Sequence, residues 1–169
     1  SAIGQGVETI CAQIAADTLG VPLARIRSVH HGSTTHLPEG FGSYASRGAV
    51  MGGSALLDAS QNLLRAIRTT AAAQFGCASD DVEICDELTQ VRARDKTRAI
   101  AELSPDGFAA DGCFVNAKRT YSYGTHAAHI TVDAQTGKIE LIDYMAVEDV
   151  GRILNPNTLH GQVLGAITQ

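Results

Sequence analysis

The sequence contains no tryptophan, and only 4 prolines and 4 cysteines are spread over its 169 residues. No two cysteines have the CxxC spacing, and their positions fit neither a zinc nor an iron–sulfur framework. A chain of this length can bury a core without disulfide bonds. We therefore expect reduced, partly buried thiols that bind no metal at Cys11, Cys77, Cys85 and Cys113.

Long apolar runs and clusters of one charge are missing as well. No stretch approaches the roughly 20 apolar residues that a membrane helix needs. Lysine and arginine are scattered and the formal net charge is -5, which argues against a nucleic-acid partner. No signal-peptide pattern is visible, so we expect a cytoplasmic location without membrane association. The 44% hydrophobic content predicts one globular domain over residues 1–169.

Apolar spacing predicts two helices in the first half of the chain. A stripe through Val7 and Ile14 predicts a helix over 7–19, which ends at Gly20 and before Pro22. A longer stripe predicts a helix over 49–75, whose first turns carry residues small enough for another backbone to pack closely. Between the helices, "RIRSVHH" predicts a short strand, and a glycine-rich and serine-rich loop follows it.

The second half of the chain favours strands. "DVEICD" and "TQVRAR" predict short strands, and "TRAIAEL" predicts a short helix. "YSYGTHAAHITVD" and "KIELIDYMAV" predict a β-hairpin through the turn "AQTG", and Pro156 favours the start of a final helix. The expected fold class is α+β, with long helices packed on a mixed or antiparallel sheet that contains this hairpin.

Three glycine-rich segments stand at predicted helix starts. Gly4-Gln5-Gly6 precedes the first helix, "GSYASRG" with Ser43, Ser46 and Arg47 precedes the second, and "LHGQVLG" with Gln162 opens the last. Backbone N–H groups at such starts bind anions such as phosphate. The alternatives are a tight turn, a helix-capping serine beside a solvated arginine, and a surface glutamine.

Other chemistries find little support in the sequence. His126 and His129 fall three apart in a predicted strand, so they should point to opposite faces rather than share a metal. No GxSxG motif indicates a hydrolase, and no pair of catalytic carboxylates stands out.

Taken together, "GQGVETICAQIAADTLGVP", "GSYASRGAVMGG" and the hairpin with its sequel "VGRILNPNTLHGQVLGAITQ" resemble the molybdopterin-binding region of the xanthine dehydrogenase/aldehyde oxidase family. These molybdenum hydroxylases place an organic molybdenum cofactor, a pterin often extended by a nucleotide, among loops at helix starts. The resemblance implies cofactor contacts and two residues of the substrate pocket. The implied cofactor contacts are Gly4, Gln5, Gly6, Ser46, Arg47, Gly48 and Gln162, and the implied pocket residues are Tyr44 and Ala45.

The resemblance also implies that the chain is one part of a larger enzyme. That enzyme hydroxylates an aldehyde or an N-heterocycle with oxygen from water, and works with iron–sulfur and flavin subunits or domains. The family's catalytic glutamate matches no residue here, and neither Glu140 nor Glu148 takes that role. We therefore expect the isolated chain to hold no cofactor and to be inactive.

Two other readings compete with this one. The chain could be a non-catalytic ligand-binding or assembly module that keeps the fold without the chemistry. An unrelated phosphate-binding domain would require the match of three motifs to be a coincidence. A glycine-rich motif with a glutamate downstream of Gln169 would favour the enzyme.

Overall fold

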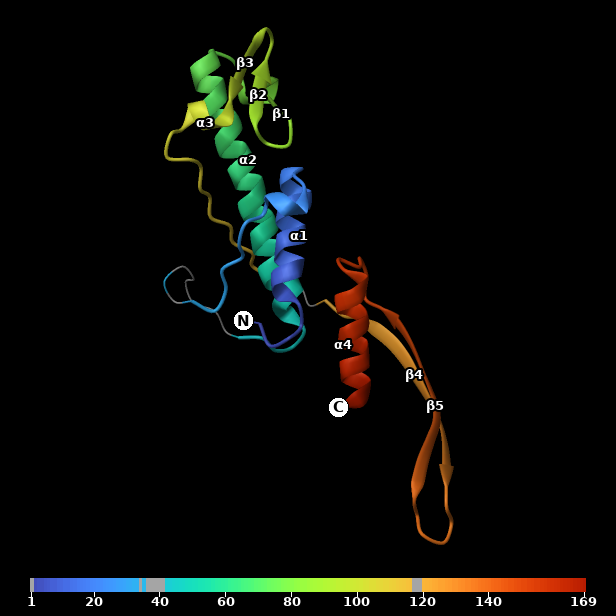
Figure 1. The fold of residues 1–169 in the computed structure, drawn as a ribbon. Coiled ribbons are helices and arrows are strands. Elements are labelled where there is room, and N and C mark those ends of the chain that lie inside the picture. The colour runs from blue at the N-terminus through green and yellow to red at the C-terminus, as the bar shows by residue number, and fades with distance from the viewer. Residues whose placement is uncertain (1, 34, 36–41, 117–119) are drawn as a thin grey trace. The chain divides into compact units, whose positions relative to one another are not determined.

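The computed structural model describes residues 2–33, 35, 42–116 and 120–169 (Figure 1). The chain forms two compact units, of which unit 1 comprises Ser1–Asn116 with Leu154–Gln169 and unit 2 is Ala117–Ile153. The assignment of residues 1–169 to a single domain remains a prediction. His36 and positions 36–41 of the expected loop lie outside the described residues.

Helices dominate unit 1. Its α-helices are α1 (Val7–Leu19), α2 (Ser54–Phe75), α3 (Ile100–Leu103) and α4 (Pro156–Thr168). Two 3-10 turns, η1 (Leu23–Arg25) and η3 (Ser79–Asp81), and a π-helical segment, η2 (Gly48–Gly53), accompany them. Among the described residues, none of these helices combines the length and the apolar content needed to span a bilayer.

The predicted first helix is confirmed with its bounds. Gly20 ends α1 in the left-handed conformation at φ 67°, and its N–H donates to Ala16 O. This geometry favours glycine because a side chain is strained there. The final helix is also confirmed, with Asn155 as its N-cap and Pro156 in its first turn.

Small residues allow close packing around the start of α2. α1 and α2 run side by side in the same direction (Figure 1). A Cβ atom built on Gly53 would lie 3.0 Å from Ile14 Cδ1. A Cβ atom on Gly112 would lie 2.2 Å from Ala55 O and 2.3 Å from Ala59 N. The prediction that another backbone packs against the small residues of this helix is therefore confirmed.

The main core lies around the second half of α2. Strands β1 (Glu83–Cys85), β2 (Gln90–Ala93) and β3 (Lys96–Ala99) form an antiparallel sheet in the order β1-β2-β3. This sheet and α3 pack against α2. Ile67 and Val91 are fully buried there, in a cluster with Phe75 and Leu103. The well-packed part of unit 1 is thus separate in sequence from the glycine-rich segments.

The structure corrects three local predictions. The strand expected at "RIRSVHH" is wrong, since η1 takes its first residue and no strand pairing follows over 26–31. The helix expected over 97–103 begins only at Ile100, because the preceding residues pair with β2 as β3. The helix expected over 49–75 starts as the π-helical η2, where Gly52 and Gly53 weaken regular α-helix.

Unit 2 is the predicted hairpin. β4 (Tyr123–Val132) pairs antiparallel with β5 (Ile139–Asp149), with a bulge between His129 and Ile130. In the turn, Asp133 Oδ1 accepts hydrogen bonds from the N–H groups of Gln135, at 2.8 Å, and Thr136, at 3.2 Å. These bonds stabilise the carboxylate and lower the pKa of Asp133. The α+β class is confirmed, with the refinement that the hairpin forms a sheet of its own.

Candidate functional site

The first glycine-rich segment has an unusual helix start. An N-cap residue is typically extended, and its side chain accepts a hydrogen bond from the helix. Gly6 instead is left-handed, at φ 77° and ψ 27°, and has no side chain with which to cap α1. Gly4 also has a positive φ, 100°, and Gln5 Oε1 accepts a hydrogen bond from Ile3 N at 2.6 Å. A left-handed residue directly before a right-handed helix turns successive N–H groups toward one point, which suits an anion.

The second glycine-rich segment is strained. Ala45 and Ser46 are both left-handed, at φ 53° and 51°, although neither is glycine. Each such residue costs on the order of 1–3 kcal/mol, and strain of this kind clusters at functional sites. The π-helical η2 follows at once, and π-helical turns are also frequent at functional sites. Two independent irregularities therefore mark this loop.

Arg47 and Tyr44 form a pair within the second segment. Arg47 Nη1 donates to Tyr44 OH at 3.0 Å, and the Arg47 Cζ atom lies 5.2 Å from the centre of the Tyr44 ring. This contact restricts the orientation of a planar guanidinium, the group best suited to a phosphate or carboxylate. Tyr44 remains 57% exposed, so one side of the ring can meet another molecule.

The third segment lies against the first. Asn155 Oδ1 accepts from Thr158 N at 3.0 Å and caps α4, while Asn155 Nδ2 donates to Gln13 Oε1 at 3.0 Å. A Cβ atom on Gly6 would lie 2.6 Å from Thr158 Cγ2. The starts of α1 and α4 therefore touch.

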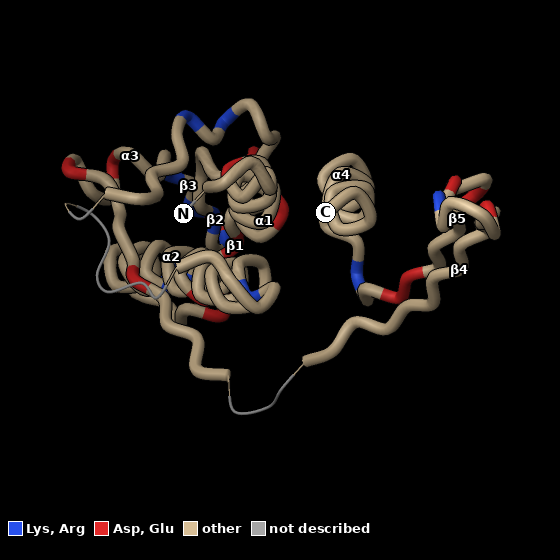
Figure 2. The backbone as a smooth tube through the Cα atoms, turned by 90° about the horizontal axis from the view of Figure 1, so that it is seen from below, with Lys and Arg blue, Asp and Glu red and all other residues tan. Residues whose placement is uncertain are grey.

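The structure thus brings parts of the predicted site together. Gln162 lies one helical turn beyond Thr158 on the same face of α4, and Thr158 contacts Gly6. η2, which follows the second segment, packs against α1. Each helix start carries a partial positive charge, so adjoining starts attract an anion. Acidic and basic residues are scattered through unit 1 (Figure 2), so backbone N–H groups rather than a basic patch would supply most of the attraction.

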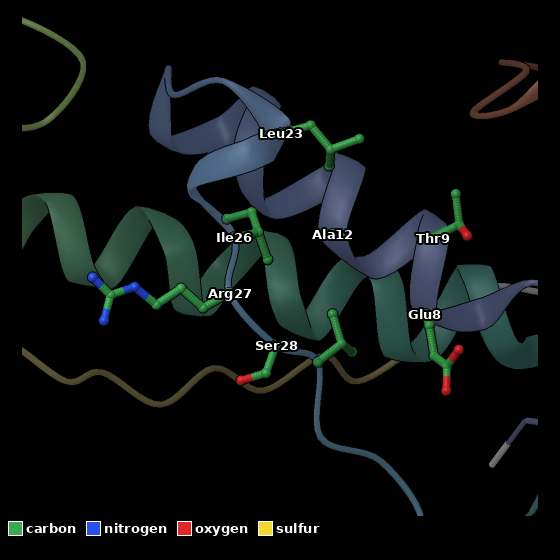
Figure 3. A pocket seen from close by; sticks show the side chains of 8 residues that line it. Glu8, Thr9, Ala12, Leu23, Ile26, Arg27 and Ser28 are labelled. Carbon is green, nitrogen blue, oxygen red and sulfur yellow. The ribbon is translucent and has the colours of Figure 1, made fainter.

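A separate groove lies on another side of α1. Glu8, Thr9 and Ala12 of α1 line it together with Leu23 and Ile26 of the following segment (Figure 3). None of the predicted site residues lines this groove. It is therefore not the site that the glycine-rich segments indicate.

The histidines of unit 2 lie as predicted, on opposite faces of the hairpin. His126 pairs with Ala146 and His129 with Asp143, three positions apart in the ladder. His126 Nδ1 bonds Tyr144 OH at 2.8 Å, and His126 Nε2 bonds Glu148 Oε1 at 2.7 Å. Within the described residues, no group of three or more His, Cys, Asp or Glu side chains could hold a metal ion.

The cysteines are free thiols in the structure. Cys11 is half-buried in α1, and this burial raises the pKa of its thiol. A raised pKa keeps the thiol protonated at neutral pH, which suits a structural side chain rather than a nucleophile.

Sequence reasoning found the three segments but missed the residues that join two of them. Gln13, Asn155 and Thr158 carry no motif that marks them as partners, because they meet only in the folded chain. Asn155-Pro156 was visible as a helix start, and that signal indicates a cap rather than a tertiary contact.

Comparisons with known proteins show the family of the chain. The family model described as "Molybdopterin cofactor-binding domain" matches residues 1–169. The gamma subunit of the 6-hydroxypseudooxynicotine dehydrogenase complex of Paenarthrobacter nicotinovorans is 32% identical, over 100% of this chain and 23% of its own length. The nicotine 6-hydroxylase large subunit of the same organism is 32% identical, over 98% of this chain and 22% of its own length.

A solved structure shares the fold. The crystal structure of the Cu,Mo-CO dehydrogenase in its carbon monoxide reduced state has a TM-score of 0.79 and 28% sequence identity, over 98% of this chain and 22% of that one. The chain thus spans less than a quarter of the length of the relatives it matches. With the whole chain matched by the family model, this protein belongs to the molybdopterin cofactor-binding domain family.

Proposed function

We propose that this chain is the cofactor-binding part of a molybdenum hydroxylase of the xanthine dehydrogenase/aldehyde oxidase type. The observation that carries the proposal is the left-handed Gly6 at the start of α1, lying against Thr158 at the start of α4. Two helix starts that meet in this way favour a bound anion. The relatives named as dehydrogenase, hydroxylase and CO dehydrogenase subunits give the reaction class, an oxidation.

The donors in this chain fit a phosphorylated pterin. N–H groups around Gly4–Gly6 and the amide of Gln5 would hold one part of it, and the amide of Gln162 another. Ser46, Arg47 and Gly48 would supply a hydroxyl, a guanidinium and a backbone N–H group. The strain at Ala45 and Ser46 supports this assignment, because a loop held in such a conformation presents its N–H groups without further reorganisation.

The number of anion-binding segments supports a cofactor that is extended by a nucleotide. The dinucleotide form carries more phosphate groups than the pterin without the nucleotide, and two separate anion-binding segments suit it better. When bound, the cofactor would supply the redox chemistry of the oxidation. The side chains of this chain bind and orient it, and none of them acts as the catalytic base.

The substrate would meet the cofactor beside the second segment. Tyr44 offers an exposed aromatic face, and Ala45 offers a small side chain next to it. An aromatic face suits a planar N-heterocycle or an aldehyde, because stacking orients a flat molecule without fixing its polar groups. The Arg47 contact holds the Tyr44 hydroxyl and so sets the direction of the ring.

Electrons must leave the site through other parts of the enzyme. The relatives are named as a complex subunit and as large subunits, which supports assembly with iron–sulfur and flavin subunits or domains. The isolated chain is expected to hold no cofactor and to turn over no substrate, because it spans less than a quarter of these relatives. An assay of the purified chain with aldehyde or purine and an artificial electron acceptor checks this, and turnover above a protein-free control would contradict it.

The binding assignment is tested in the enzyme whose large subunit carries this chain. Gln5→Ala and Gln162→Ala should each lower cofactor affinity about ten- to a hundredfold, because a hydrogen bond to a charged group is worth about 1.5–3 kcal/mol. Molybdenum per subunit, from elemental analysis, and turnover are the measurements. Gln61→Ala, on an exposed position of α2, is the matched control. Wild-type molybdenum content in both site variants would refute the assignment.

A further inference from the structure

The contact between α1 and α4 rests on few groups. Most of α4 is exposed, and the partly covered positions at its N-cap and along one side are Asn155, Thr158, Leu159, Val163 and Ile167. The contacts that join its start to α1 are the Asn155–Gln13 hydrogen bond and the approach of Thr158 to Gly6. The N-terminus of α4 is therefore held against α1 by named side chains.

The amide of Asn155 makes two different bonds at once. Its oxygen accepts from the backbone N–H of Thr158, and its nitrogen donates to Gln13 Oε1, both at 3.0 Å. A backbone N–H can only donate, so the oxygen must face the helix and the nitrogen must face α1. The Asn155 side chain thus caps the N-terminus of α4 and also anchors it to α1.

The glycine at position 6 allows the second contact. With a methyl group there, Thr158 Cγ2 would be 2.6 Å away, much closer than the about 3.5–4.0 Å of an ordinary carbon contact. Gln162 follows Thr158 by one turn, so the position of Thr158 determines how far the Gln162 amide stands from the first segment.

Adjoining helix starts also repel each other through their partial positive charges. A contact is needed to keep them together before an anion arrives. Holding binding groups in place beforehand lowers the entropy lost on binding and so raises affinity.

From these contacts we propose that Gln13 and Asn155 are positioning residues, which set where Gln162 stands relative to Gly4–Gly6. The inference rests on the proposed function, because its consequence is measured as cofactor retention. Neither residue is assigned to touch the cofactor. Their effect passes through the placement of α4.

Three variants separate the roles of the Asn155 amide. Asn155→Ser keeps a capping oxygen but cannot reach Gln13, and Gln13→Ala removes the acceptor. Asn155→Asp keeps the capping oxygen and regains the contact when the Gln13 amide turns to donate instead of accept. The serine and alanine variants should therefore loosen α4 alike, while the aspartate variant should keep α4 in place. Because the added carboxylate also repels an anion, the aspartate variant is compared by hydrogen exchange alone. Gln61→Ala is again the control.

The experiment uses the enzyme whose large subunit carries this chain and measures two quantities. Hydrogen exchange of the α4 amides should be about fivefold faster in Asn155→Ser and Gln13→Ala, as expected for one lost hydrogen bond. Molybdenum per subunit should fall severalfold in the same two variants, whereas Asn155→Asp should keep the wild-type exchange of α4. The Gln13→Ala/Asn155→Ser double variant should be no worse than either single one, because both remove the same bond.

The outcomes distinguish the two hypotheses. Unchanged α4 exchange in both variants, or faster exchange with wild-type molybdenum content, overturns the positioning role. The proposed function survives either result as long as Gln5→Ala and Gln162→Ala still lose molybdenum. If those two variants keep their molybdenum, the assignment of Gln5 and Gln162 to the cofactor fails, and the positioning role fails with it.

Discussion

Replacing Gly6 by alanine would place a methyl group where Thr158 already stands. The added Cβ would lie 2.6 Å from Thr158 Cγ2, so α4 would have to move away by about 1 Å to restore an ordinary contact. Gly20 provides a matched control on the same helix. It has a similar left-handed φ, 67° against 77°, and a Cβ atom there would meet nothing within 4 Å.

Both substitutions put alanine in a left-handed backbone conformation, but only Gly6→Ala also creates a steric clash with α4. A left-handed alanine costs about 1–2 kcal/mol at either position. Gly6→Ala should cost about 1 kcal/mol more, because moving α4 breaks the bond between Asn155 and Gln13. Thr158→Ser removes the clashing methyl but keeps the hydroxyl that donates to Asn155 O at 3.1 Å. In the Gly6→Ala variant, Thr158→Ser should therefore raise the free energy of unfolding by about 1 kcal/mol.

Urea unfolding of the chain gives the free energies, and hydrogen exchange over 156–168 reports α4 directly. Exchange should become faster in Gly6→Ala, stay unchanged in Gly20→Ala, and recover in Gly6→Ala/Thr158→Ser. Equal free energies for the two alanine variants, together with no coupling to Thr158→Ser, would show that α4 does not lie on Gly6.

Three further predictions concern other parts of the chain. Iodoacetamide should modify the exposed Cys113 before Cys11, since burial raises the pKa of the Cys11 thiol and leaves little thiolate; equal rates by mass spectrometry would contradict this. Because the pKa of Asp133 is lowered, its stabilisation of the hairpin turn is complete above the ordinary aspartate pKa and is lost as pH falls through the lower folded value. NMR of the turn should show this pH dependence, and Asp133→Asn should remove the pH dependence. Ile67→Ala should cost about 2–5 kcal/mol in urea unfolding, whereas the exposed Ile3→Ala should cost almost nothing.

The sequence predicts correctly the elements that are determined by residues within or next to them. The stripe through Val7 and Ile14, with Gly20 and Pro22 behind it, fixes both ends of α1. The "AQTG" turn between two β-prone runs defines the hairpin. In both cases the residues that determine the element lie within it or next to it.

Predictions failed where a distant partner decides the structure. The backbone at Ile26 is extended, at φ -78° and ψ 107°, but no strand pairs with it. Residues 97–99, the start of the predicted helix, belong instead to β3 (Lys96–Ala99), because β2 pairs with them. The segments of the site were visible from glycine patterns, whereas the Gln13–Asn155 contact was not, because no local pattern connects the two residues.

The bond between Gln13 and Asn155 joins residues that are 142 positions apart. Closing a flexible loop of that length costs about 4 kcal/mol of chain entropy, which is more than one hydrogen bond returns. The contact can therefore form only after α2 and its sheet have folded and shortened the path between the two ends. During synthesis, α1 emerges well before α4 exists. We therefore expect the junction of the two helix starts to form after the core of unit 1, so that a ligand that needs it is loaded onto a chain whose core has already formed.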